Sequence, residues 1–393
     1  MTSVSHVFAA VVVLTFGATA HAGLFPTYPL GTGPGVWEID RWAPAIFSNA
    51  GTVNGRSNVL DLGVNAADHF DPLANNFANT QGRGIQIADA PGYSVLYGSL
   101  YVQPSWSSSA GIATNRRTEL WGVLSPATGA DTCAGSACNL FPIIGFSNAS
   151  PTDPIHAGGT GRFRVWDVNT GFVDLPATVN YGQWNDVCIA WTGTDPQHNI
   201  VFYVNGVQVY LNANPLPSDM NNGPPTHWSR QIQQEYNWGT TYDSNWSSLG
   251  TGIATAAAAT SGAGQATSPG SAFPSPITVT VTDASGAPLP CVPVTFTAPG
   301  AGASATLSAG TVVTNLLGQA TVTATANGTA GSYAITASAP GGVSAATIPL
   351  SNGLPGPPVI SHIPALDAPM LVALAVLLGI LGGLARRRMR CGN

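Results

Sequence analysis

Residues 199–211 have the sequence NIVFYVNGVQVYL, which predicts two short strands joined by a tight turn. Asn205 and Gly206 form the turn, because a two-residue type I′ turn needs a positive φ at both of its central positions. Apolar side chains alternate along both strands, so one face of the hairpin is expected to be buried. The expected cross-strand pairs are Val204 with Val207 and Phe202 with Val209; the expected buried set is Phe202, Val204, Val207, Val209 and Leu211, with Tyr203 and Gln208 facing outward.

The same alternation extends through much of residues 23–250. In the segment WNDVCIAW (184–191), Val187, Ile189 and Trp191 share one face of a strand. Gly, Pro, Asn and Asp separate many such short runs, and no segment shows a convincing 3.6-residue periodicity. The chain is therefore expected to be all-β, with one large antiparallel sandwich over residues 23–250.

The order of a Trp-led strand at residues 182–191 and the hairpin FYVNG at residues 202–206 resembles the LamG/concanavalin-like jelly roll. The resemblance covers about 30 residues directly. It implies two curved antiparallel sheets and a frequent role in binding glycans or extracellular proteins.

A second alternating region begins with ITVTVTD at residues 277–283 and continues with PVTFT at 293–297 and GQATVTAT at 318–325. Val279, Val281, Val294 and Phe296 are expected to point inward, with Thr outward, as a two-sheet sandwich requires. This region resembles the bacterial Ig-like domains of invasin and intimin, over residues 261–352, and Cys291 stands where that family often has Gly. The composition predicts a flexible linker at 251–260 and a Pro/Gly spacer at 353–362.

The N-terminus resembles a removable export signal. An apolar run at residues 7–16 is followed by the small-residue pattern Ala20-x-Ala22, which predicts a signal peptide over residues 1–22 and cleavage between Ala22 and Gly23. Residues 1–6 depart from the usual pattern, because they contain His6 but no Lys or Arg. An apolar run of this length is too short to span a bilayer.

The C-terminus combines an apolar run, MLVALAVLLGILGGLA (370–385), with an arginine cluster. It predicts a membrane-spanning helix over residues 369–385 and a cytoplasmic tail that contains Arg386, Arg387 and Arg388. With the preceding Ile363, Pro364, Ala365 and Leu366, residues 363–393 resemble the IPTL-CTERM sorting signal of Gram-negative bacteria, although Ala365 replaces the usual Thr. The resemblance implies recognition by an exosortase-type membrane peptidase and delivery to the cell surface or extracellular matrix, and it leaves open whether the helix is cleaved off or stays as an anchor.

Charge and cysteine content restrict the partners and the compartment. The formal net charge is −6, all twelve basic residues are Arg, and the part of the chain before Pro364 carries −9, which argues against nucleic acid as a partner. An oxidising exterior favours a disulfide between Cys133 and Cys138, which flank a four-residue loop. Cys188 and Cys291 fall in two different predicted domains, and each is expected to be a buried free thiol.

No catalytic constellation stands out. Glu38 and Asp40 share a strand face, as in laminarinase-like glycosidases, but residues 42 and 43 are Trp and Ala, so the second Glu of that pattern is missing. An edge-strand ion pair or cap is the expected role. The chain has three Glu and no HExxH, GxSxG or phosphate-binding glycine motif. Bound cofactors are not expected, apart from structural calcium in loops near Asp68, Asp71, Asp167 or Asp243.

Two predicted strands have an unusual polar face. In RTELW (117–121) and RFRVW (162–166), alternate residues place arginine and tryptophan on the same side. Trp can stack on a pyranose, while Arg and Glu hydrogen-bond its hydroxyls or an acidic uronate; the competing interpretation is an internal Arg–Glu ladder that fixes strand register. The candidate glycan-binding residues are Arg117, Glu119, Trp121, Arg162, Arg164 and Trp166.

The sequence thus predicts an exported, C-terminally sorted surface protein that binds extracellular polysaccharide or a surface partner through the jelly roll, without catalysis. The alternative is a purely structural component of an exopolysaccharide matrix. A polysaccharide-degrading hydrolase or lyase is the third hypothesis.

Overall fold

The computed structural model describes residues 24–25, 27–31, 35–68, 79–87, 92–125, 140–150, 158–167, 169–193, 199–213, 226–353 and 376–378. Strands dominate this part of the chain, as expected. Three short 3-10 turns interrupt them, at Ala66–Asp68, Pro104–Trp106 and Ile112–Thr114. Residues 376–378 are helical. No helix within the described ranges has the length and apolar character that crossing a bilayer requires. The predicted signal peptide, spacer and sorting motif lie outside these ranges, apart from Gly353.

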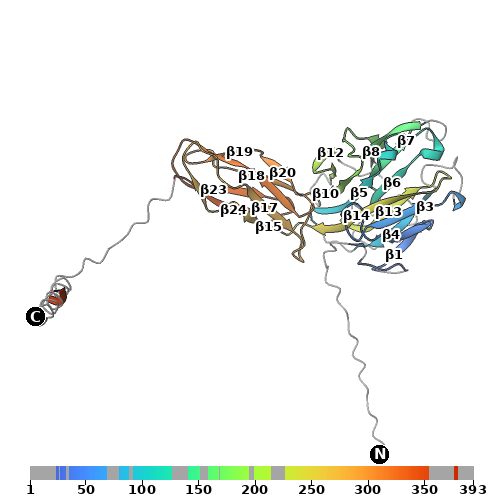
Figure 1. The fold of residues 1–393 in the computed structure, drawn as a ribbon, viewed down its shortest axis with the longest axis horizontal. Helices are drawn as coiled ribbons and strands as arrows, with labels where there is room; N and C mark the ends of the chain where they lie inside the picture. The colour runs from blue at the N-terminus through green and yellow to red at the C-terminus, as the bar shows by residue number, and fades with distance from the viewer. Residues whose placement is uncertain are drawn as a thin grey trace, which may run out of the picture. The chain divides into compact units, whose positions relative to one another are not determined.

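Two seven-stranded antiparallel sheets form the larger sandwich (Figure 1). The first sheet has the order β1 (Trp37–Arg41), β4 (Thr80–Gln86), β13 (His227–Tyr236), β6 (Arg117–Ser125), β7 (Ile143–Ala149), β8 (Gly158–Asp167) and β9 (Gly171–Asp174). The second has the order β12 (Val207–Asn212), β11 (Ile200–Val204), β10 (Gln183–Trp191), β5 (Ser94–Val102), β14 (Tyr242–Ile253), β3 (Leu60–Val64) and β2 (Ile46–Asn49).

The core of this sandwich lies between the two sheets. From β6 it takes Leu120 and Leu124, and from β10 it takes Val187, Ile189 and Trp191, as the alternation predicted. Because successive residues of a strand point to opposite faces, Arg117, Glu119 and Trp121 of β6 must then lie on the outer face of the first sheet.

The predicted hairpin is present as β11 and β12. Asn205 and Gly206 have φ values of 51° and 76°, and Val204 pairs with Val207. The pairing of Phe202 with Val209 was wrong, because a register shift pairs Phe202 with Tyr210. The expected burial was also wrong at three positions. Val207 and Leu211 are 62% and 45% exposed, whereas Tyr203 is 3% exposed.

A smaller sandwich follows along the chain. One sheet consists of β15 (Ala256–Ser261), β17 (Ile277–Thr282) and β21 (Gln319–Val322). The other consists of β16 (Gln265–Thr267), β24 (Ala346–Asn352), β23 (Gly331–Ser338), β18 (Pro293–Thr297) and β20 (Thr311–Val313), with β19 (Ala305–Leu307) and β22 (Ala324–Ala326) as a separate pair. Val279, Val281, Val294 and Phe296 are buried, as predicted.

The two sandwiches share an apolar cluster. It joins the outer face of the second sheet, including Val95, Ala190 and Tyr203, to core residues of the smaller sandwich such as Val292. Tyr203 is therefore buried by the second domain, which a strand-by-strand interpretation could not show. The predicted linker at 251–260 is wrong, because these residues continue β14 to Ile253 and then form β15. The described residues up to Asn352 belong to one compact unit.

A disulfide between Cys188 and Cys291 crosses this shared cluster. The prediction of two free thiols is therefore wrong: assignment to different domains does not separate residues when the domains pack together. Cys291 has a φ of 60°, in the left-handed region that favours glycine. The Cys133–Cys138 prediction lies outside the described residues.

Candidate functional site: an arginine–tryptophan face on the first sheet

The six candidate residues lie on one face of three neighbouring strands. β7 separates β6 from β8, and its register aligns the two predicted rows. Arg117 and Arg162 both pair with Ser147, Glu119 and Arg164 both pair with Gly145, and Trp121 and Trp166 both pair with Ile143. The structure therefore brings the two motifs together in matching order, and we call these six residues the arginine–tryptophan face.

The half of this face that belongs to β6 is buried. Arg117 donates to both carboxylate oxygens of Glu119, at 2.6 and 3.1 Å, and the indole Nε1 of Trp121 donates to Oε2 at 2.9 Å. All three side chains are at most 3% exposed. They form the internal Arg–Glu ladder that was the competing interpretation, so they support the face rather than offer groups to a ligand.

The half that belongs to β8 is partly exposed. Arg162 forms an ion pair with Asp174 of β9 at 2.6 Å and donates to the Ala149 carbonyl at 2.8 Å. Trp166 packs edge-on against Phe172, with ring centroids 4.9 Å apart. This half places accessible aromatic surface beside cationic groups, which suits contact with a sugar ring.

Arg164 differs from the other arginines of the face. Its guanidinium lies 3.7 Å from the centroid of the Phe172 ring, and its Nε–H is buried without an acceptor. Burial and the positive charge of Arg117 lower the pKa of Arg164 to about 9, although Glu119 and Asp174 act in the opposite direction. The protein environment therefore disfavours the charged form of the Arg164 guanidinium.

Polar residues on β1 and β13 extend the same outer face. Arg230 of β13 forms an ion pair with Glu38 of β1 at 2.6 Å, and Gln234 donates to Asp40. Burial raises the pKa of Asp40, while the charges of Arg41 and Arg230 oppose that shift. The expected edge-strand ion pair of Glu38 is confirmed. The position of Arg230 was missed, because no local signal shows that β13 enters the sheet beside β4.

Three glycines on the outer face of the first sheet leave room for side chains of the neighbouring strands. A Cβ at Gly145 would lie 2.6 Å from Glu119 Cγ, one at Gly82 would lie 2.7 Å from Gln234 Cγ, and one at Gly84 would lie 2.9 Å from Arg230 Nε. Each glycine therefore lets a long polar side chain of the neighbouring strand lie across it.

The predicted calcium ligands that the structure describes do not come together around one site. Asp167 accepts hydrogen bonds from the backbone N–H groups of Asn169 and Thr170 and from the Tyr210 hydroxyl. No group of three or more metal-ligating side chains occurs among the residues that the structure describes, and Asp71 lies outside them. Calcium binding stays a prediction.

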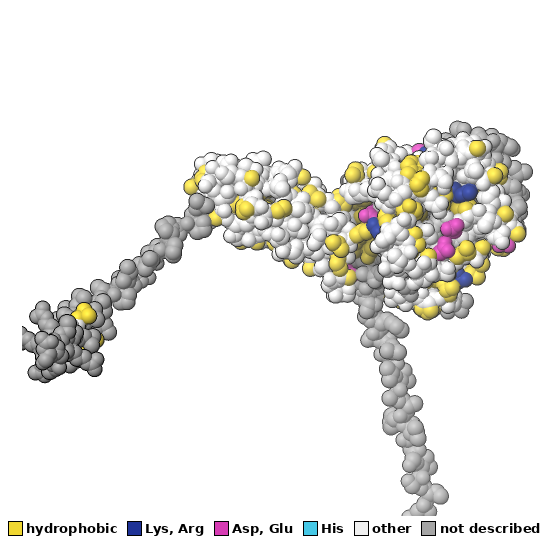
Figure 2. All heavy atoms as spheres, in the orientation of Figure 1, with side chains coloured by type: hydrophobic (Ala, Val, Ile, Leu, Met, Phe, Trp, Pro, Cys, Tyr) yellow, Lys and Arg dark blue, Asp and Glu magenta, His cyan; other side chains and the backbone are white. Residues whose placement is uncertain are grey.

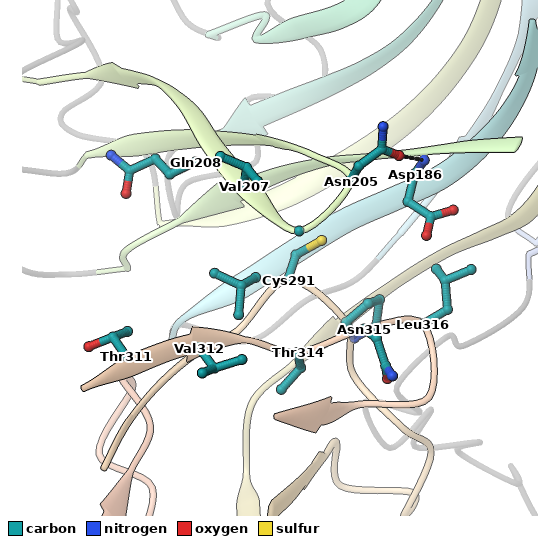
Figure 3. A pocket seen from close by; sticks show the side chains of 13 residues that line it. Asp186, Asn205, Val207, Gln208, Cys291, Thr311, Val312, Thr314, Asn315 and Leu316 are labelled. Carbon is teal, nitrogen blue, oxygen red and sulfur yellow. Dashed lines mark hydrogen bonds between the residues drawn. The ribbon is translucent and has the colours of Figure 1, made fainter. Parts of the chain in front are cut away.

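A cavity of about 630 Å³ lies where the β11–β12 turn meets the smaller sandwich (Figure 3). Asn205, Val207 and Gln208 line one side, and Val312 and Asn315 are among the residues on the other. Its one carboxylate, Asp186, accepts a hydrogen bond from Ser99 at 2.6 Å and lies 3.4 Å from Arg56. The cavity lining offers amides and hydroxyls but no free charge.

Charge is unevenly distributed between the two sandwiches. Residues 255–352 contain a single charged side chain, Asp283, which is 3% exposed. Figure 2 shows the same contrast, with basic and acidic side chains gathered on the larger sandwich. Among the described residues, the charged side chains therefore lie mainly on the larger sandwich. The arginine–tryptophan face is thus a stronger candidate site than the cavity.

Comparison with known proteins identifies the smaller sandwich. Residues 274–350 match the family described as bacterial Ig-like domain (group 1), so this part is a bacterial Ig-like domain, as its sequence resemblance implied. A comparison with curated protein sequences finds no match.

Solved structures similar to the chain include a domain of intimin, an alginate lyase and an endo-1,3-beta-glucanase. The D00–D0 domain of intimin is 19% identical and covers 46% of this chain and 72% of its own, with a TM-score of 0.18. Alginate lyase vAL-1 from Chlorella virus is 10% identical; the match covers 55% of this chain and 90% of the lyase, with a TM-score of 0.32. Endo-1,3-beta-glucanase from Streptomyces sioyaensis is 12% identical; the match covers 57% of this chain and 98% of the glucanase, with a TM-score of 0.29. These TM-scores are low, and no property of these proteins is transferred to the chain.

Proposed function

We propose that the protein is an exported, non-catalytic surface protein that binds extracellular polysaccharide through the arginine–tryptophan face. The observation that carries the proposal is the partly exposed group of Arg164, Trp166 and Phe172, which lies across β7 from the buried Arg117–Glu119 pair on the same face. Protein–sugar contacts combine an aromatic ring, which covers the apolar face of a pyranose, with charged hydrogen-bond groups at its edge.

The carboxylates in and beside the arginine–tryptophan face support binding rather than hydrolysis. Glu38, Glu119 and Asp174 each form an ion pair with an arginine, at 2.6 Å in every case. A glycosidase needs one carboxyl group that stays protonated as the general acid and a second that acts as base or nucleophile. A carboxylate in an ion pair with arginine is stabilised in its charged form and already engaged, so it suits neither role. Asp40, which accepts from Gln234 and lies 4.0 Å from Arg230, is likewise engaged.

The bacterial Ig-like domain supports the surface assignment, and its nearly uncharged composition suits a spacer between the binding domain and the envelope. In this proposal the signal peptide exports the chain, and an exosortase-type peptidase recognises residues 363–393. Cell fractionation should then recover the protein from the envelope or the extracellular matrix; recovery of the uncleaved chain from the cytosol would contradict export.

The binding test compares two tryptophans. Trp166→Ala removes the aromatic platform and should reduce glycan-array binding of the full-length chain at least tenfold. Trp184→Ala is the matched control, because Trp184 is also partly exposed and packs edge-on against an aromatic ring, that of Tyr101 at 5.6 Å, but belongs to the second sheet. Equal binding by both folded variants would contradict the proposal.

A further inference from the structure

We propose that the polysaccharide bound by this face is acidic, and that a sugar carboxylate binds the guanidinium of Arg164. This inference rests on the proposed function and adds the chemical class of the ligand.

The first argument is the set of partners that each arginine has. Arg117 is held by Glu119, Arg162 by Asp174 and Arg230 by Glu38, and Arg41 donates to the Thr80 hydroxyl at 2.8 Å. Arg164 makes no hydrogen bond or ion pair with any residue that the structure describes. Asp174 is its direct partner in the β8–β9 register, yet that carboxylate pairs with Arg162 instead. Arg164 therefore feels the charges of Glu119 and Asp174 but is in direct contact with neither carboxylate.

The second argument is geometric. Arg164 stacks on Phe172 with its centre 3.7 Å from the ring centroid, so one flat side of the guanidinium is covered. Hydrogen bonds from a guanidinium lie in its plane, and stacking leaves that plane free to receive a planar carboxylate through two parallel bonds. The Nε–H is buried, so the two terminal nitrogens of the guanidinium are the groups that a ligand carboxylate would contact.

The third argument is the apolar neighbour. Trp166 and Phe172 form an edge-on pair directly beside Arg164, since residues 164 and 166 share a strand face. A uronic acid has an apolar ring face and a carboxylate at its edge, and it therefore matches both parts of the site. A neutral hexose would fill the aromatic part but leave the cation without an anion.

The experiment compares two polymers with the same backbone. Polygalacturonate carries one carboxylate per sugar, and its fully methyl-esterified form carries none. We expect the full-length protein to bind polygalacturonate at least tenfold more tightly than the ester in isothermal titration, with an affinity that falls as salt is added. Sulfated dextran, tested in parallel, distinguishes a carboxylate site from general attraction of anions; tighter binding of sulfated dextran than of polygalacturonate would overturn the inference.

Arg164→Gln tests the assigned residue. It should reduce polygalacturonate affinity at least tenfold and leave binding of the methyl ester unchanged. Arg56→Gln, between β2 and β3, is the control, and the arginines of the C-terminal tail are present in every variant. If Arg164→Gln does not fold, Arg164→Lys keeps the charge without the planar fork and is still expected to lose affinity. Unchanged polygalacturonate affinity in a folded Arg164 variant would overturn the inference.

The outcomes separate the two proposals. Equal binding of both polymers, lost in Trp166→Ala, would retain glycan binding and overturn the acidic ligand. Binding of neither of these polymers nor of any array glycan would overturn both proposals.

Discussion

Single residues on β13 show that this strand is polar on both faces. Gln231, Gln233 and Glu235 point into the space between the two sheets, because they pair with the core-facing positions of β6, and each is at most 1% exposed. Burial raises the pKa of Glu235 well above its ordinary value; the neighbouring Asp61 and Asp243 add to the shift, while Ser244 and Arg116 oppose it. Burial in this position therefore favours the neutral form of the carboxyl over the charged form.

Glu235→Gln should make the protein more stable at neutral pH but not at pH 4. The raised pKa means that the folded state binds a proton more tightly than the unfolded state. The neutral Glu235 therefore stabilises the fold fully below the unfolded pKa of about 4.3, and this contribution is lost as pH rises toward the folded pKa, by at most about 1.4 kcal/mol per pH unit. Urea unfolding of both proteins from pH 4 to pH 8 measures the difference, and parallel stability curves would contradict it.

At the scale of the element, β7 determines how the candidate site is built. Its residues separate two arginine-bearing strands, and its glycine leaves room for the side chain of Glu119. Alternation in the sequence correctly placed arginine and tryptophan on one face of each strand. It could not show that β6 supplies the buried half and β8 the accessible half, because exposure depends on what packs above each strand.

Gly145→Ala should destabilise the larger sandwich by about 1–3 kcal/mol, the range for overpacking a filled site. The added Cβ would lie 2.3 Å from the Thr118 carbonyl oxygen, and neither strand can move without disturbing its ladder. Gly310→Ala is the control, since a Cβ there would meet no atom within 4 Å. Differential scanning calorimetry compares the two, and equal melting temperatures would contradict the expected crowding.

At the scale of the whole molecule, the larger sandwich and the Ig-like domain are joined by packing as well as by a covalent bond. The Tyr93 hydroxyl donates to the Cys291 carbonyl at 3.2 Å, next to the disulfide to Cys188. The bond closes a sequence separation of 103 residues and restricts the unfolded chain accordingly.

Removing this disulfide should cost about 2–4 kcal/mol of stability. Two variants at position 291 distinguish the contribution of the disulfide to stability from that of the backbone conformation. Cys291→Ala keeps a side chain at a positive φ, whereas Cys291→Gly removes that strain and should be more stable than the Ala variant by about 1 kcal/mol. Thermal unfolding without reductant measures both effects. Mass spectrometry provides the check, because alkylation of Cys188 and Cys291 in the unreduced, denatured wild-type chain would show that the bond does not form.

The sequence by itself determined the properties that depend on neighbouring residues: the all-β class, the Asn205–Gly206 turn, the inward valines of the Ig-like domain, and the shared face of Arg164 and Trp166. These follow from a side-chain period of two and from local backbone preferences. Tertiary structure alone decided which faces are covered. Tyr203 is buried, Cys188 forms a disulfide with Cys291, and Arg117 is buried in an ion pair while Arg164 has no direct ion pair among the described residues, because strand order and domain packing bring together residues far apart in the chain.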